Sequence, residues 1–499
     1  MTELVWRFAV LSGLLSIFCS CLIADGQEPP VSELTQDCIS CHSSATPAIV
    51  ADWQRSRHSK TTPAESLKKP QLQRLISTDK VPEKLAGVVV GCAECHMANE
   101  AAHQDSFDHG GQKVHLLVSP KDCATCHPTE SIQYEKNLMS HARGNLTNNQ
   151  LYGDLMKSIN GLQSLEALKT RLADPDKYTE AESCFHCHGT AVEVKGKKTR
   201  DTDFGEMEFL VLSGWPNQGV GRFNTDGSMG SCTPCHSRHQ FSMELARKPY
   251  TCSQCHKGPD VPAYKAYSVS KHAAIFSSLY HEWNFKEVPW TLGTHITAPT
   301  CAVCHASLLT NSDGTVVAER THQMSDRLPW RILGLIYAAP HPRSPDTSII
   351  RNKDGQPLPT ALSGEPAAEY LISADEMAIR KQNMQKVCTA CHARNWVDGH
   401  WDRFENTLRT SNEMTKTGTE IISKAWGEKV ADRAVLFDEA IEKLWVEQWL
   451  FYANSTRFAS AMMGADYGVF ANGRWYLAKN IQDMLDHLRF LMATKNKSR

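Results

Sequence analysis

Eight repeats of Cys-x-x-Cys-His constrain this chain of 499 residues more than any other feature. In such a motif the two thiols can add to the vinyl groups of a porphyrin, and the adjacent imidazole becomes the proximal iron ligand of a c-type haem. The sequence therefore predicts eight covalently attached haems, each with one iron. The cysteines are Cys38, Cys41, Cys92, Cys95, Cys123, Cys126, Cys184, Cys187, Cys232, Cys235, Cys252, Cys255, Cys301, Cys304, Cys388 and Cys391, and the histidines are His42, His96, His127, His188, His236, His256, His305 and His392.

Two other uses of paired cysteines fit the pattern poorly. Zinc sites pair Cys-x-x-Cys with a second ligand pair at a set distance and do not need a histidine after every second cysteine. Disulfide frameworks belong mostly to much shorter chains and leave the eight histidines unexplained. The motifs use sixteen of the eighteen cysteines.

Eight haems also predict the fold class, which is mainly α, with a haem-packed core and long C-terminal helices. With roughly sixty residues for each haem, the porphyrins themselves form much of the core and the polypeptide wraps around them. We expect one octahaem cytochrome c domain over residues 25–400 and a helical region over residues 401–499. The net charge of −2 and pI near 6.9 do not indicate nucleic acid or an acidic membrane as a partner.

The N-terminus predicts export. Arg7 precedes an apolar run over residues 8–23, and a polar stretch follows from Asp25. Residues 1–24 therefore read as a cleaved signal peptide, with a retained membrane anchor as the alternative. The two spare cysteines, Cys19 and Cys21, lie in this run without a good lipidation signal. Export to the periplasm, or to an equivalent lumen, agrees with haem attachment outside an energy-conserving membrane.

The histidines outside the motifs are candidates for the second axial ligand of the irons, because electron-transfer haems are usually six-coordinate. Fourteen such histidines are present and at most seven or eight are needed. We expect six of them to close an iron, namely His58, His109, His141, His239, His272 and His322. The seventh ligand is ambiguous among His103, His295, His341 and His400.

The connections between motifs are less informative. Leucines spaced over residues 145–182 predict a helical hairpin that covers the haem at Cys184. Residues 189–231 predict a glycine-rich connection with a short strand at residues 207–212, either a lid or a packing insertion. Prolines in residues 310–382, six of them between Pro340 and Pro366, favour extended coil.

The C-terminal region predicts helices. Aromatic and apolar residues recur at three- and four-residue spacing through residues 430–462, and we expect this stripe to be core between helices. A glycine-flanked break around Tyr467 follows, and a helix resumes over residues 474–495. Since no haem motif lies beyond His392, these helices are free to pack on another subunit.

The chain resembles the octahaem hydroxylamine oxidoreductases over essentially its whole mature length. Besides the order of the eight motifs, the resemblance rests on Cys-His-x-Arg-His239-x-Phe-Ser, Arg-Lys-Pro-x-x-Cys252, Ser-Lys-His272, Ala-Pro-Thr-Cys301 and Thr-His322. It implies a mostly helical trimer whose catalytic haem is the fourth, held by Cys184, Cys187 and His188. It also implies a tyrosine from a neighbouring subunit bonded to that porphyrin, and Tyr467 falls in the matching place. An ordinary packed phenol is the alternative.

The same resemblance places Asp260 over the catalytic iron as a proton-handling group. The family follows this aspartate with a histidine, whereas this chain has Val261. An apolar neighbour disfavours the charged carboxylate and would suit a reductase that delivers protons. We expect oxidation of hydroxylamine or hydrazine at a five-coordinate haem, with electrons leaving through haems closed by two histidines. Reduction of nitrite or nitric oxide and a purely electron-conducting protein are the alternatives. We expect a small redox protein, such as a c-type cytochrome, as the partner.

Overall fold

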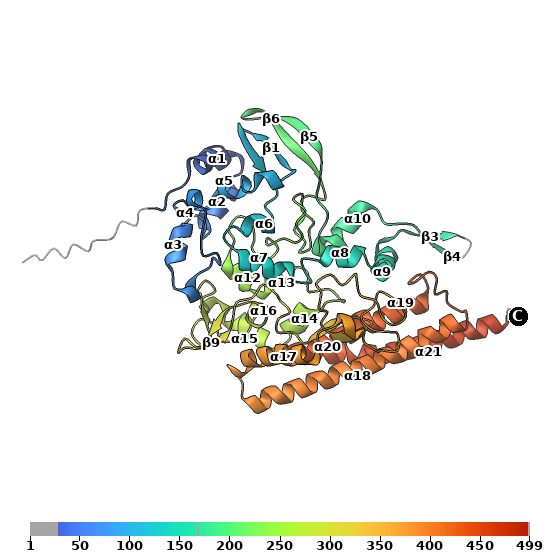
Figure 1. Ribbon diagram of the computed structural model, residues 1–499. Helices are drawn as coiled ribbons and strands as arrows, with labels where there is room; N and C mark the ends of the chain where they lie inside the picture. Colours follow the sequence, from blue (N-terminus) through green and yellow to red (C-terminus); the bar gives the residue numbers. More distant parts are fainter. Residues whose placement is uncertain (1–27, 167–168, 498–499) are drawn as a thin grey trace, which may run out of the picture.

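The computed structural model describes residues 28–166 and 169–497, and it consists of short helices and loops packed against a set of long C-terminal helices (Figure 1). The predicted mainly α class is confirmed. The predicted signal peptide and Cys19 and Cys21 lie outside the described residues. Every helix within the described ranges is too short or too polar to cross a lipid bilayer.

Most of the haem motifs sit in or beside short helices. Three motifs form a single helical turn each, while others end a helix or lie inside one, so each histidine follows its cysteines with fixed geometry. The helices of this part are α1 (Glu33–Ala45), α2 (Pro47–Arg55), α3 (Pro63–Lys68), α4 (Glu83–Ala86), α5 (Cys92–His96), α6 (Pro120–Cys123), α7 (Pro128–Glu135), α8 (Ala142–Thr147), α9 (Gln150–Asn160), α10 (Lys177–Glu182), α11 (Cys184–His188), α12 (Met243–Arg247), α13 (Pro249–Cys252), α14 (Ala263–Ser268), α15 (Lys271–Leu279), α16 (Cys301–His305) and α17 (Ala374–Thr389).

The strands form small separate sheets at the edges of the helical part. Four are antiparallel hairpins, and one sheet has three strands with a parallel β7–β8 pair. The strands are β1 (Ser106–His109), β2 (Gln112–His115), β3 (Gln163–Glu166), β4 (Lys169–Leu172), β5 (Glu193–Thr202), β6 (Gly205–Ser213), β7 (Trp290–Thr291), β8 (Leu309–Thr310), β9 (Val316–Ala318), β10 (Trp330–Leu335) and β11 (Tyr337–Pro340).

The helical hairpin predicted over residues 145–182 is wrong. One helix, α9, ends at Asn160, and the β3–β4 hairpin follows it. The backbone of Gly161 lies so close to the end of α9 that a Cβ at this position would be 2.5 Å from the carbonyl oxygen of Lys157. A larger residue therefore does not fit where the helix ends. Leu162 and Leu165 are more than 70% exposed, so their helical spacing did not reflect packing.

The strand predicted at residues 207–212 is confirmed as part of β6, but its long partner β5 was not expected. The proline-rich segment is mostly irregular as predicted, although it also contains the β10–β11 hairpin and the start of α17.

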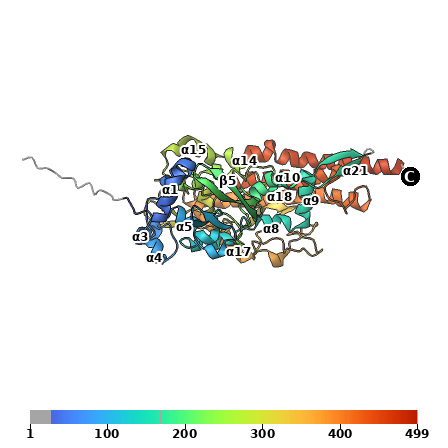
Figure 2. The same ribbon diagram turned by 90° about the horizontal axis from the view of Figure 1, so that it is seen from above.

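The C-terminal helices lie side by side along one edge of the molecule (Figures 1 and 2). They are α18 (Arg394–Gly427), α19 (Ala440–Val446), a π-helical stretch (Glu447–Ala453), α20 (Asn454–Met462) and α21 (Arg474–Lys497). The expected break lies between α20 and α21 and contains a π-helical turn, Tyr467–Ala471.

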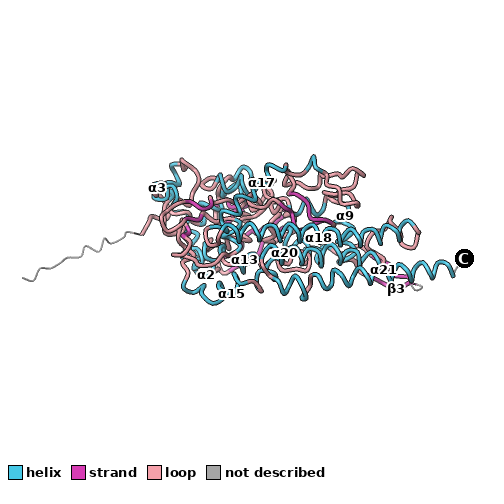
Figure 3. Tube along the Cα trace, turned by 90° about the horizontal axis from the view of Figure 1, so that it is seen from below, coloured by secondary structure: helices cyan, strands magenta, loops and turns pink. Residues whose placement is uncertain are grey.

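The predicted aromatic stripe is core, as expected. Trp445 and Trp449 are buried together with Ile422 of α18 and Met484 of α21 in the largest apolar cluster. Burying such side chains contributes about 1.5–3 kcal/mol each. The helix begins at Ala440 rather than at residue 430, and the loop before it leaves Val435 half exposed. Seen from below, the C-terminal region consists of long helices, whereas the motif-bearing part consists largely of loops and short helices (Figure 3).

Candidate haem array and active site

The thiols of different motifs approach one another and connect the eight motifs into one series. Four thiol pairs interact directly, and three more are close enough to act on each other electrostatically. The direct pairs are Cys38 with Cys92, Cys123 with Cys232, Cys187 with Cys255, and Cys252 with Cys301. The electrostatic pairs are Cys95 with Cys126, Cys235 with Cys252, and Cys304 with Cys388.

These contacts give the series an order. It runs through the first, second, third, fifth, sixth, seventh and eighth motifs, and the fourth motif joins it at the sixth through Cys187 and Cys255. The fourth motif is thus a side branch. Electrons can enter this branch from the series, but electrons that travel along the series need not cross it. This position is suitable for a haem at which a substrate reacts.

Several motif histidines are oriented as iron ligands would be. A metal-binding imidazole usually donates its second N–H to a nearby acceptor, which fixes the ring. Nδ1 of His42 bonds Thr46 Oγ1 at 2.8 Å, and Nδ1 of three others donates to a backbone carbonyl: His96 to His115 at 2.9 Å, His188 to Ala142 at 3.1 Å and His305 to Met324 at 3.2 Å. In each ring Nε2 remains for the iron.

Burial also keeps these rings in the neutral form that binds metals. Burial lowers the pKa of His96 to about 4 and that of His236 to about 3. It lowers the pKa of His188 and His256 as well.

Five motif histidines each face a histidine from elsewhere in the chain. A metal–imidazole bond is about 2 Å long, so two imidazoles on opposite sides of one iron have ring centroids about 6 Å apart. The observed centroid distances match: His42 to His109 6.1 Å, His58 to His127 6.4 Å, His96 to His239 6.4 Å, His236 to His322 6.3 Å and His272 to His392 6.1 Å.

Distance alone does not identify such a pair, as His115 shows. Its ring centroid is also 6.1 Å from that of His96. However, Nδ1 of His115 is 3.0 Å from the carbonyl oxygen of Leu117, and Nε2 is 2.9 Å from that of Ala98. Because both nitrogens are occupied, this ring is structural.

The candidates for the seventh ligand fall into different environments. Both ring nitrogens of His103 contact carboxylates, Asp105 and Asp122, which raise its pKa although burial opposes them. His341 is buried and is close enough to His305, a motif histidine with no facing ring among the described residues, for the two to interact electrostatically.

The remaining candidates, His295 and His400, have other ring contacts, although His400 lies close enough to His272 and His392 to be affected by them electrostatically. His295 accepts a hydrogen bond from the backbone of Thr291 on Nδ1 at 3.0 Å, and His400 stacks on Trp396. His141, one of the six expected ligands, instead directs Nε2 to the carbonyl oxygen of Glu135 at 3.1 Å. Among the described residues, no histidine ring stacks opposite His188 or His256 at the distance of the five pairs.

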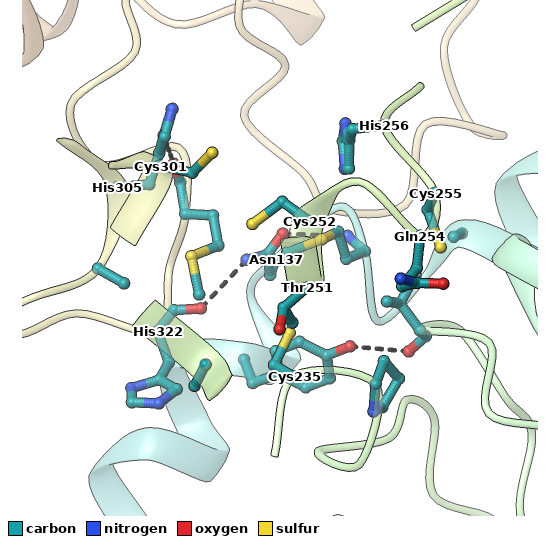
Figure 4. A pocket seen from close by; sticks show the side chains of 18 of the residues that line it. Asn137, Cys235, Thr251, Cys252, Gln254, Cys255, His256, Cys301, His305 and His322 are labelled. Carbon is teal, nitrogen blue, oxygen red and sulfur yellow. Dashed lines mark hydrogen bonds between the residues drawn. The ribbon is translucent and has the colours of Figure 1, made fainter. Parts of the chain in front are cut away.

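The interior has both the space and the charge for haem. Motifs two to eight line one connected cavity of about 2840 Å³, and Figure 4 shows Cys235, Cys252, Cys255 and Cys301 around part of it. Buried guanidinium nitrogens of four arginines have no protein acceptor: Arg74, Arg143, Arg238 and Arg247. Haem carries two carboxylates, which guanidinium groups bind well. The residues present therefore fit c-type haem.

The surroundings of His188 differ from those of the facing pairs. Asp260 lies close enough to act electrostatically on His188 and on His256, and on the thiols of Cys184 and Cys187. Its backbone carbonyl oxygen accepts a hydrogen bond from Nδ2 of the buried Asn454 at 3.1 Å. Asp260 is thus held between the fourth and sixth motifs by a residue of α20.

Tyr467 is packed inside its own chain. It is 9% exposed and lies in a buried cluster with Ala266 of α14 and Phe458 of α20. Val261, the neighbour of Asp260, packs against the same cluster. Asp260 and Tyr467 are therefore connected through one apolar contact region.

A helical fold with eight Cys-x-x-Cys-His motifs, seven of them around a shared cavity, defines the class of multihaem c-type cytochromes. Residues 217–324 match the family described as seven times multi-haem cytochrome CxxCH. Residues 37–116 and 122–208 match the family of cytochrome c554 and c-prime.

A solved structure titled "Hypothetical multiheme protein" is 40% identical, with a TM-score of 0.88, and the match covers 94% of this chain and 98% of that one. The chain belongs to the same family of multihaem cytochromes.

Two relatives from Kuenenia stuttgartiensis are more distant. A probable nitrite reductase-hydroxylamine oxidoreductase fusion protein is 24% identical over 411 residues, which is 79% of this chain but only 38% of that protein. A reducing HAO-like protein complex shares the fold at 16% identity and a TM-score of 0.62, over 93% of this chain and 87% of that one. The first match covers part of a longer protein, and the second shows a shared fold.

Sequence reasoning did not single out Asn454 or the four arginines whose buried guanidinium nitrogens lack an acceptor. Asn454 lies inside a helix with an apolar stripe, where a polar residue could have been noted as exceptional. Nothing in the sequence around Arg143 or Arg238 indicates that their guanidinium groups are buried.

Proposed function

We propose that this protein is an octahaem enzyme that reduces a small inorganic nitrogen compound, nitrite or nitric oxide, at the haem of Cys184–His188. The observation that carries the direction is the packing of Val261 and Tyr467 into one buried cluster of the same chain. Both positions that would serve the oxidising reaction are used for apolar packing.

The proposed roles of the residues follow from their positions. His58, His109, His239, His272 and His322 close five irons opposite motif histidines, and His341 closes that of His305. His188 holds the iron that substrate reaches, with its ring fixed by the carbonyl oxygen of Ala142. When bound, the haem supplies an iron that binds the nitrogen compound and exchanges electrons with it.

Asp260 is proposed to hold and deliver protons beside this iron. Asn454 fixes the backbone of Asp260, so the carboxyl group stays between the fourth and sixth motifs. The side chain of the next residue, Val261, packs against the apolar cluster of Ala266, Phe458 and Tyr467. A positioned acid contributes about 100-fold or more to such a reaction.

The test compares both directions on purified protein. Nitrite and nitric oxide are assayed with reduced methyl viologen, and hydroxylamine and hydrazine with an artificial electron acceptor. We expect turnover under reducing conditions, and Asp260→Asn should lower it about 100-fold while cyanide still binds the iron. Asp79→Asn, an exposed aspartate outside the cavity, is the control.

Val261→His tests the direction from the opposite side, because it restores the histidine of the oxidising pattern. A gain of hydroxylamine oxidation would support the assigned role of Val261. Wild-type protein that oxidises hydroxylamine and leaves nitrite and nitric oxide unchanged would contradict the proposal.

Oxidation of hydroxylamine or hydrazine is the second candidate, and the helix break at Tyr467–Ala471 favours it, because the break presents a tyrosine where the resemblance expects one. That version requires Tyr467 to leave its cluster and bond the porphyrin of a neighbouring chain in a homotrimer. Chains that stay joined on denaturing electrophoresis, and separate in Tyr467→Phe, would establish it. A protein that turns over no substrate and has all irons closed would instead be an electron conduit.

The proposal includes export to the periplasm or an equivalent lumen and exchange of electrons with a small redox protein. Secretion of a fusion of residues 1–27 to a reporter enzyme tests the export signal.

A further inference from the structure

An exposed tryptophan stacks directly on the axial histidine of the eighth motif. The ring centroids of Trp396 and His392 are 4.3 Å apart, and their planes differ by 18°. Trp396 is 39% exposed. Two more rings continue the stack along α18, because residues four apart share one helix face: His400 follows at 5.8 Å and Phe404 at 6.5 Å. The indole therefore joins the motif to the surface.

This contact lies at one end of the motif series. The eighth motif approaches the rest through Cys304 and Cys388, and its second cysteine, Cys391, is exposed. Since α18 runs along the outer edge of the molecule, its first turns are open to a partner (Figures 1 and 3). An end of the series with an exposed aromatic edge is a suitable place for electrons to enter or leave.

Exposed cations lie on the segments next to the tryptophan in the fold. Lys271 precedes the facing histidine of this motif, Lys386 lies two residues before Cys388, and the Arg403 guanidinium folds back along the helix toward Gly399. Arg394 is paired with Asp398 at 3.2 Å, and Lys381 with Glu405 at 2.8 Å. Asp402 is the exposed acid on this stretch outside those pairs. Of these side chains, the ones outside the ion pairs are therefore three cations and one acid.

We propose that Trp396, with Lys271, Lys386 and Arg403, forms an electron-transfer port at which an acidic one-electron carrier protein docks. The aromatic side chain provides the central contact, as tryptophans do in many interfaces, and the cations steer and orient the acidic partner. In the reducing direction the carrier loses one electron and the ferric haem of the eighth motif gains it. No bond forms and no proton moves. The port concerns only this end of the series, so it holds for either direction of catalysis and for any substrate.

Stopped-flow reduction of the intact haem-loaded protein tests the port, with a flavodoxin as the acidic probe and a mitochondrial cytochrome c as the basic one. Flavodoxin hydroquinone gives up one electron to become the semiquinone, and haem absorbance reports the reduction. At low ionic strength we expect flavodoxin to react at least about tenfold faster than the basic probe when compared at equal driving force.

Four variants separate the tryptophan and the charges from general effects. Trp396→Leu and Arg403→Glu should each lower the second-order rate constant about tenfold, and Arg403→Glu should also weaken its salt dependence. Two controls should react as wild type: Trp475→Leu, which removes an exposed tryptophan on α21, and Lys416→Glu, which reverses an exposed charge further along α18. The low-spin spectrum should be unchanged in all four, because none removes a proposed iron ligand.

Carbodiimide cross-linking followed by mass spectrometry gives a readout independent of rates. It should join carboxylates of flavodoxin to the amines of Lys271 and Lys386. Cross-links that gather elsewhere, Trp396→Leu and Arg403→Glu that both react as wild type, or no preference for the acidic probe would each overturn the proposal. If Trp396→Leu does not fold, Arg403→Glu and the cross-links still decide the outcome.

Discussion

Replacing Asn454 by leucine should destabilise the protein more than any other single change near the candidate active site. Asn454 is fully buried, and its amide makes three hydrogen bonds. Nδ2 donates to the carbonyl oxygen of Asp260 at 3.1 Å, and Oδ1 accepts from the backbone N–H of Gly334 at 3.2 Å and from Nη1 of Arg457 at 3.1 Å. Leucine has nearly the same size but can make none of these bonds.

The magnitude follows from the partners left behind. A buried polar group without a hydrogen bond costs about 1–3 kcal/mol, and more when it is charged. Two backbone groups and one guanidinium lose a partner, which gives about 3–6 kcal/mol in total. Arg457 is itself fully buried, and burial lowers its pKa to about 9. The loss of one acceptor for its guanidinium group therefore costs more stability than the same loss at the surface would. It retains Ser411 and Asn412 as acceptors.

Guanidinium denaturation monitored by circular dichroism and by the haem absorbance measures this loss. Asn472→Ala, which removes one hydrogen bond to Ser455 on the adjoining segment, is the control and should cost about 1 kcal/mol. Asn454→Leu should also loosen the backbone of Asp260 and speed hydrogen exchange in that segment. A loss below about 1 kcal/mol would refute the view that Asn454 links α20 to the active site.

Three further outcomes are expected. His272→Ala should convert one low-spin haem to a cyanide-binding form without loss of attached haem, whereas His281→Ala, an exposed histidine, should leave the absorption spectrum unchanged. Burial raises the pKa of Glu442 from 4.5 to about 7, so folding favours its protonated form. The stability that this adds is complete below pH 4.5 and is lost as the pH rises through 7, by about 2–3 kcal/mol. The denaturation midpoint of Glu442→Gln should therefore depend less on pH than that of the wild type. Tyr467→Phe should leave electrophoretic mobility and nitrite reduction unchanged if the phenol only packs, and a lost inter-chain band would show the cross-link instead.

Features that depend on neighbouring residues were predictable from the sequence. The Cys-x-x-Cys-His spacing specifies haem attachment locally, and the stripe containing Trp445 and Trp449 identified core helices because helical periodicity is local too. The β5 strand was not predictable in this way. Lys195, Lys197 and Lys198 are exposed on it, so no apolar alternation indicates a strand, and pairing with β6 defines it.

The pairing of histidines depends on long-range contacts that no local pattern encodes. His103 and His109 lie in one short segment, and the sequence predicted His109 as a ligand and left His103 as one of four candidates for the seventh. In the structure the carboxylates of Asp105 and Asp122 occupy His103, while His109 faces His42. Burial and competing acceptors therefore decide which histidines are free to bind iron, and the sequence could supply only the candidates.

Electron paramagnetic resonance of the ferric protein, recorded with and without cyanide, shows whether the haem of Cys184–His188 has an open iron. We expect a high-spin signal that cyanide converts to low-spin, and we expect its loss in a Cys184→Ala/Cys187→Ala variant that cannot attach the fourth haem. The low-spin signals of the facing histidine pairs should remain in that variant. A wild-type protein without a cyanide-sensitive high-spin haem, or a signal that persists in the variant, would contradict the assignment of the open iron to His188.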